Sequence, residues 1–149
     1  MQVMLQIAYE AFAACTSVVV DGADGHPLHI RTMDWEMPEL EPLTIEVDFV
    51  RGGAVVFRAT TWAGYVGVLT GVKPDGFSVS VNYRRTQRGD ERPLAELVRN
   101  LARGALRHWP VSFLVRQVLD EDENFRVAVS SLSASELMAP AYELCGIPF

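Results

Sequence analysis

The stretch of residues 15–35, CTSVVVDGADGHPLHIRTMDW, constrains the fold of this chain more than any other. Residues 17–21 are mainly β-branched and apolar, and they predict a buried strand. Gly22 and Gly25 permit the positive φ angles of a hairpin loop, and residues 26–31 predict the returning strand. This hairpin groups a thiol, a guanidinium and a carboxylate that together suit nucleophilic chemistry. They belong to Cys15, Arg31 and Asp34.

The rest of the chain predicts more sheet followed by helices. Alternating or apolar runs predict strands, and the segments with helical apolar spacing come later. The strands are expected at 43–50, 54–60 and 77–82 and the helices at 93–106, 110–119 and 125–132, with an extended segment at 136–144. Pro38 and Pro42 predict a loop between the hairpin and the next strand. Strands with segregated helices indicate an α+β layered domain.

Composition limits the classes of function. The chain has 149 residues, enough for one domain, and its net charge of −6 argues against a general nucleic-acid binder. A local run of arginines is expected to be a solvated loop and helix face, at positions 84, 85, 88, 92, 99, 103 and 107. No run approaches the roughly 20 apolar residues of a membrane span. Residues 1–14 have helical apolar spacing and predict a helix that packs on a core or lies on a lipid surface.

The two cysteines leave two interpretations open. No CxxC pair suggests zinc. A bond between Cys15 and Cys145 in an oxidising compartment would exclude Cys15 as a nucleophile. A lone cysteine is also more often a small buried apolar residue than a reactive one. The three histidines, at positions 26, 29 and 108, are expected to be surface or packing residues rather than catalytic bases.

Without a histidine partner, the thiol of Cys15 could be activated by its own nitrogen. If the bond between Ala14 and Cys15 were cut, the new α-amino group would lie beside the sulfur and could act as a base near neutral pH. Arg31 would stabilise negative charge on the sulfur, and Asp34 would orient the ammonium form. Asn82, at the end of a predicted strand, could donate to an oxyanion. This is the mechanism of an N-terminal nucleophile (Ntn) hydrolase.

The sequence resembles the acid ceramidase and N-acylethanolamine-hydrolysing acid amidase family in these same segments. The nucleophile region matches through YEAF at 9–12, CTSVV at 15–19 and HIRTMD at 29–34. The similarity continues along the chain with PLT at 42–44, DF at 48–49, AGYVG at 63–67, LTGVKP at 69–74, FSV at 77–79, Asn82 and APAY at 139–142.

The resemblance implies a specific chemistry. Members of this family cut themselves immediately before the cysteine and hydrolyse the amide bond of fatty-acid amides through a thioester, without a metal or cofactor. By position Cys15 matches the nucleophile, Arg31 and Asp34 match the groups that support its thiol and amine, and Asn82 matches an oxyanion-site asparagine. The family fold is a four-layer αββα sandwich. It implies a residual propeptide over 1–14 and the N-terminal part of an Ntn-hydrolase domain over 15–149.

Two departures from the family pattern matter. Tyr83 stands where the acid amidases usually have glutamate, as in the bile-salt branch of the wider group. The family's second half, with further strands, a second asparagine and an arginine, has no counterpart in these 149 residues. We therefore expect a truncated member, in which another copy or a missing C-terminal half covers the open sheet.

Three functions follow as expectations. The first is hydrolysis of N-acyl lipid amides of the N-acylethanolamine or ceramide type, with peripheral membrane contact. The second is a bile-salt or penicillin V hydrolase of the choloylglycine type. The third is an inactive homologue that binds lipid or a partner. The resemblance implies lysosomal residence for an animal protein and cytoplasmic residence for a bacterial one.

Overall fold

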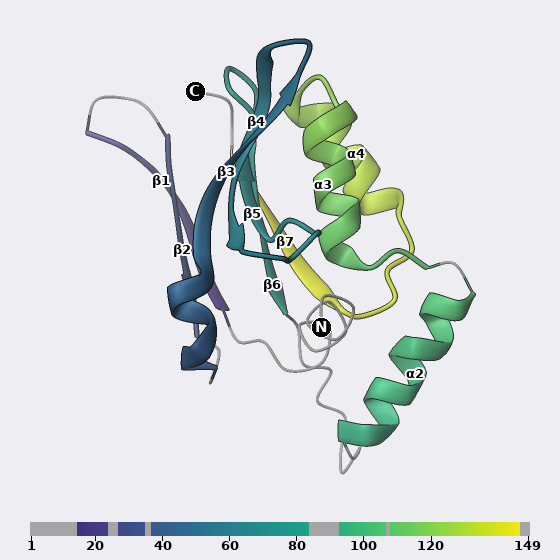
Figure 1. Ribbon diagram of the computed structural model, residues 1–149. Coiled ribbons are helices and arrows are strands. Elements are labelled where there is room, and N and C mark those ends of the chain that lie inside the picture. Colours follow the sequence, from purple (N-terminus) through teal and green to yellow (C-terminus); the bar gives the residue numbers. More distant parts are fainter. Residues whose placement is uncertain (1–14, 24–26, 35–36, 84–92, 107, 147–149) are drawn as a thin grey trace.

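The computed structural model describes residues 15–23, 27–34, 37–83, 93–106 and 108–146. Some of the expectations above lie outside the described residues: the helix over 1–14, Ala14, His26, and the arginines at 84, 85, 88, 92 and 107. Within the described residues, a hairpin lies on one face of a five-stranded sheet and two helices cover the other face (Figure 1). The α+β architecture of antiparallel sheets flanked by helices agrees with the sequence expectation.

The hairpin consists of β1 (Cys15–Asp21) and β2 (Pro27–Met33), which pair antiparallel. Exposure alternates along both strands because successive side chains of a strand point to opposite faces. The outer face carries exposed apolar side chains, those of Val18, Val20, Leu28 and Ile30. The inner face carries Cys15, Ser17, His29 and Arg31, so these four side chains face the larger sheet.

The larger sheet is antiparallel throughout, in the order β3-β4-β5-β6-β7. Its strands are β3 (Thr44–Arg51), β4 (Ala54–Trp62), β5 (Thr70–Val72), β6 (Ser78–Tyr83) and β7 (Ala141–Gly146). The hairpin packs over β6 and β7. Ser78, Ser80 and Asn82 alternate with Val79 and Val81 along β6, so one face of this strand is polar and the other apolar.

The apolar face of the sheet packs against α3 (Val111–Glu121) and α4 (Phe125–Ala134). Helix α3 buries residues at i, i+3, i+4 and i+7 spacing, Val111, Leu114, Val115 and Val118. These residues form the core with Phe57, Phe77, Val79 and Val81. Asn124 caps α4 by accepting hydrogen bonds from the backbone N–H groups of Arg126 and Val127, both at 3.1 Å.

Helix α2 (Pro93–Ala105) projects below α3 (Figure 1). Its position agrees with the expected helix, but Val98, Leu101 and Leu106, in and just after it, are exposed. No helix of the described part of the chain is long and apolar enough to cross a membrane.

Several sequence expectations were wrong in detail. The loop expected around Pro38 and Pro42 is a 3₁₀ helix, η1 (Pro38–Leu43). The short strand β5 was missed because its glycine and brief length give no alternating pattern. Helix α3 continues past residue 119 to Glu121. The segment expected to be extended from 136 becomes a strand only at Ala141, after a single bridge between Trp109 and Leu137.

Candidate active site

The candidate site lies between the inner face of the hairpin and the polar face of the sheet. Strand alternation places Cys15 and Ser17 of β1 on that inner face, beside His29 and Arg31 of β2. The antiparallel register sets Ser17 opposite Arg31 and Cys15 opposite Met33. The site is therefore built from alternate positions of strands rather than from a loop.

Arg31 connects the hairpin to two strands of the sheet. Its Nη2 donates to the Cys15 Sγ at 3.1 Å and to the Val81 carbonyl at 3.0 Å. Its Nη1 donates to the Thr70 hydroxyl at 3.0 Å. These bonds fix a planar cation against the sulfur, where it would stabilise developing negative charge.

Cys15 lies at the first position of β1, is half-buried and forms no disulfide. Cys145 is also a free thiol, so the structure contains no bond between the two. The pKa of Cys145 is raised to about 11, chiefly by burial and also by the Glu143 carboxylate. Cys145 is thus poorly suited to nucleophilic chemistry, whereas Cys15 has a guanidinium at hydrogen-bonding distance.

Asn82 lies near this pair, one residue after the Val81 carbonyl that Arg31 binds. The Asn82 Oδ1 accepts a hydrogen bond from the Ser17 hydroxyl at 2.9 Å. Ser17 in turn accepts from the Ser80 hydroxyl at 2.8 Å. The side-chain amide of Asn82 is therefore bonded to the hairpin, and Ser17 is bonded in turn to Ser80 of β6.

His29 completes the polar layer between the sheets. Its Nε2 lies 2.8 Å from the Ser80 Oγ, and its Nδ1 lies 2.8 Å from the Ser78 Oγ. Burial and then the nearby Arg31 cation lower the pKa of His29, which favours the neutral imidazole. His29, which was expected to be a surface or packing residue, is a member of an inter-sheet hydrogen-bond network.

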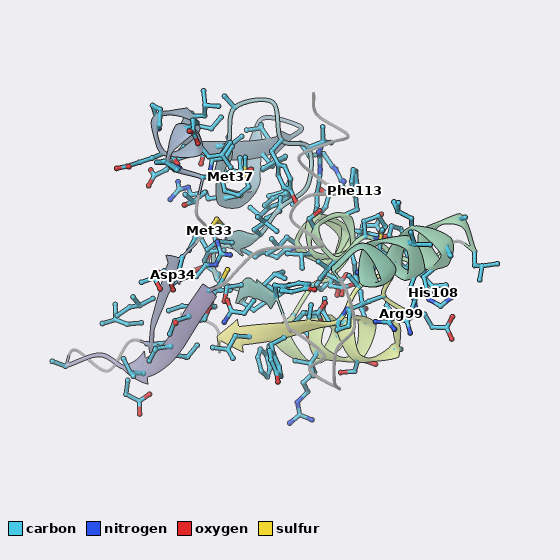
Figure 2. The ribbon with its side chains drawn as sticks, turned by 90° about the horizontal axis from the view of Figure 1, so that it is seen from below. Met33, Asp34, Met37, Arg99, His108 and Phe113 are labelled. Atoms are coloured by element: carbon cyan, nitrogen blue, oxygen red, sulfur yellow. The ribbon has the colours of Figure 1, made fainter. Side chains whose placement is uncertain are left out.

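Asp34 follows Met33 at the end of the hairpin where Cys15 also lies, and Figure 2 shows Met33 and Asp34 side by side there. The Asp34 Oδ2 accepts from the Thr32 hydroxyl at 3.4 Å, and Asp34 is exposed. Figure 2 also shows His108 with Arg99 on the opposite side of the molecule, where His108 lies 3.6 Å from Glu136. His108 is thus remote from the candidate site.

A cavity of about 520 Å³ opens beside Arg31. Its apolar walls come from the end of the hairpin, from η1 and from the sheet, namely Met33, Met37, Pro38, Leu40, Trp62 and Leu69. Polar groups line the part that contains Arg31, Thr60 and Thr70. Such a cavity suits a ligand with a polar group and a long apolar portion. Among the described residues, no group of three or more His, Cys, Asp or Glu side chains could hold a metal ion.

The structure brings Cys15 and Arg31 into contact and places Asn82 next to the backbone that Arg31 binds. Sequence reasoning missed Thr70, Ser17, Ser80 and the role of His29. The signal for the serines was present, because Ser17 follows Cys15 by two residues and Ser80 precedes Asn82 by two. Thr70 could not be found in this way, since it lies on the strand that was missed.

The chain is similar to known amidohydrolases over almost all its length. Acid ceramidase from Heterocephalus glaber is 36% identical over 97% of this chain and 39% of its own. N-acylethanolamine-hydrolyzing acid amidase from Rattus norvegicus is 40% identical over 97% of this chain and 38% of its own. No family model matches.

A solved structure has the same fold. The Caenorhabditis elegans N-acylethanolamine-hydrolyzing acid amidase ortholog matches with a TM-score of 0.76 and 34% identity, over 89% of this chain and 55% of its own. The chain thus spans about two-fifths of the length of the curated relatives it matches. The antiparallel sheets flanked by helices thus have the fold of part of an Ntn hydrolase.

Proposed function

This chain is a homologue of the acid ceramidases and N-acylethanolamine-hydrolysing acid amidases, and from that relationship we propose that it hydrolyses the amide bond of N-acyl lipids with Cys15 as nucleophile. The observation that supports this most directly is the 3.1 Å contact between the Arg31 Nη2 and the Cys15 Sγ beside an apolar cavity. A cation at a thiol favours attack by the sulfur.

Activation begins with cleavage of the bond between Ala14 and Cys15. The sulfur attacks the Ala14 carbonyl carbon, the C–N bond breaks, and the nitrogen takes up a proton to become an α-amine. Water then hydrolyses the resulting thioester and releases residues 1–14. Asp34 has a role only after this step, because the nitrogen of Cys15 is an uncharged amide until the bond is cut.

The same groups then act on the substrate. The α-amine accepts the thiol proton as the sulfur attacks the amide carbonyl. Asn82 donates to the oxyanion of the tetrahedral intermediate, and Arg31 stabilises charge on the sulfur. The amine product leaves with a proton, and water hydrolyses the acyl thioester to regenerate Cys15 and a fatty acid.

The cavity beside Arg31 supports a substrate with a long acyl chain. Its methionine, leucine and tryptophan walls would bury methylene groups, each worth about 0.8 kcal/mol. The flexible side chains of Met33 and Met37 in these walls suit an extended acyl chain better than a rigid conjugated bile acid. We therefore favour a linear fatty-acid amide.

Self-cleavage is tested by intact-mass spectrometry of the full chain. Incubation should produce a mass loss that corresponds to residues 1–14. The variant Cys15→Ala should keep its full mass, whereas Cys145→Ala should be cleaved like the wild type. A wild-type mass that does not change over a range of pH would contradict the proposal and favour an inactive binding homologue.

The substrate class is tested on the cleaved protein. A long-chain N-acylethanolamine and a ceramide are compared with a conjugated bile salt and penicillin V, with released amine or amino acid as the readout. We expect hydrolysis of the lipid amides alone. Preferential hydrolysis of the bile salt would move the protein to the choloylglycine branch.

A further inference from the structure

A continuous hydrogen-bond chain connects His29 to Asn82 through two serine hydroxyls. The distances are 2.8 Å from His29 Nε2 to Ser80 Oγ, 2.8 Å from Ser80 Oγ to Ser17 Oγ, and 2.9 Å from Ser17 Oγ to Asn82 Oδ1. This series of hydrogen bonds crosses three times between the hairpin and β6. Ser80 is fully buried, and its two partners in the chain belong to the hairpin.

The number of hydrogens available fixes which group donates in each of these hydrogen bonds. A hydroxyl has one hydrogen to donate. Ser17 gives its hydrogen to Asn82, and Ser80 gives its hydrogen to Ser17. Ser80 must then accept from His29, so the neutral imidazole carries its proton on Nε2 and accepts at Nδ1 from Ser78.

The opposite tautomer of His29 would exchange donor and acceptor in every one of these hydrogen bonds. With the proton on Nδ1, His29 Nε2 would accept from Ser80, and Ser80 would have to accept from Ser17. Ser17 would then accept from the amide of Asn82, which would have to turn over to offer Nδ2 in place of Oδ1. The position of one imidazole proton therefore decides which branch of the Asn82 amide faces Ser17.

We propose that His29 is a positioning residue that holds the Asn82 amide, through Ser80 and Ser17, with Oδ1 toward Ser17, so that the other branch of the amide is the Nδ2 donor that an oxyanion requires. The inference rests on the proposed function, in which Asn82 donates to the tetrahedral intermediate. An amide turned over would present an oxygen to the developing negative charge. His29 thus acts on the reaction without touching the substrate.

The surroundings of His29 suit this role. Burial and the Arg31 cation both lower its pKa, which favours the neutral ring. Protonation of Nδ1 would reverse only the Ser78 contact and would leave Nε2 as a donor to Ser80. Gly146 lies opposite Ser78, and a side chain there would meet the Ser78 hydroxyl and the His29 ring. The glycine leaves the space that the network occupies.

The first test does not depend on activity. Nitrogen NMR of the full chain should show His29 as the Nε2–H tautomer, with the signal assigned from its loss in His29→Gln. The side-chain amide signals of Asn82 should shift in His29→Asn and stay close to wild type in His29→Gln. A Glu- or Gln-length side chain reaches the Nε2 position, whereas asparagine reaches only that of Nδ1. An Nδ1–H tautomer would overturn the proposal.

The second test is kinetic. We expect His29→Asn to lower kcat about tenfold or more with KM within about twofold, because a misplaced donor affects mainly the transition state. His29→Gln should restore most of kcat. Ser17→Ala should lower kcat by a similar factor. The double variant, with Ser17→Ala and His29→Asn, should lose little more, since both changes interrupt the same series of hydrogen bonds.

The outcomes separate the two proposals. If the wild type hydrolyses no N-acyl amide, the proposed function fails, and the NMR result alone decides whether His29 orients Asn82. If hydrolysis occurs and His29→Asn and His29→Gln lose kcat equally, or the two single losses multiply, His29 only packs the hairpin and the inference is wrong. Thermal unfolding of each variant shows whether the fold is retained.

Discussion

The planar guanidinium of Arg31 donates to groups on three different strands, and this geometry distinguishes arginine from lysine at the same position. These groups are the Cys15 Sγ, the Thr70 hydroxyl and the Val81 carbonyl. They come from three strands, so Arg31 also aligns the hairpin on the sheet. An ammonium group is a point charge without the fixed fork that reaches all three.

We predict that Arg31→Lys slows self-cleavage by about tenfold or more while the chain remains folded, and that Arg31→Met slows it further by removing the charge. The half-life is measured by intact mass. Arg58→Lys is the matched control, because Arg58 is exposed and does not contact the thiol. Its Nε lies 3.1 Å from the Asp48 Oδ1. An Arg31→Lys variant that is cleaved at the wild-type rate would show that the fork is not needed.

At the scale of elements, β5 is a three-residue strand in the middle of the sheet whose central residue is Gly71. A Cβ at Gly71 would lie 2.5 Å from the Leu119 Cδ1 and 3.1 Å from the Arg58 carbonyl oxygen. Leu119 is fully buried on α3 and cannot move aside freely. Helix and sheet therefore approach here at a distance that only glycine allows.

Substitution Gly71→Ala is expected to destabilise the fold by about 1–3 kcal/mol through overpacking. Gly104→Ala in α2 is the matched control, since its Cβ meets only the flexible end of Met138, at 3.3 Å, and alanine favours a helix. Urea unfolding measures both. Leu119→Val should recover part of the loss in the Gly71→Ala background, and no recovery would indicate a cause other than this contact.

The strands and helices with regular patterns could be predicted from sequence, and β5 could not. Alternation in β3 and β6 and the apolar spacing of α3 gave their type and their approximate bounds. Glycine in β5 removes the side chain on which such a pattern depends. The site shows the same division: Cys15, Arg31 and Asn82 stand out by residue type, whereas Thr70 joins them only through the pairing of β5 with β6, which is a long-range feature.

At the scale of the whole molecule, pH acts on stability through a carboxyl group in the sheet. Glu143 lies on β7 opposite Val81, and burial raises its pKa to about 7 from 4.5. The folded chain thus keeps a proton on Glu143 at pH values where the unfolded chain has lost it. Since the folded state binds more protons between about 4.5 and 7, its stability falls as pH rises through this range and does not recover above it.

We predict that Glu143→Gln raises the unfolding temperature at pH 8 and changes it little at pH 4.5 or below. Glutamine resembles the protonated carboxyl in shape and removes the cost of burying a charge at this position of β7. Thermal unfolding over this pH range measures the difference. Glu123→Gln replaces an exposed carboxyl and should give the same small change at every pH. An equal gain from Glu143→Gln at acidic and basic pH would show that the substitution improves packing and that ionisation of Glu143 does not limit the stability of the fold.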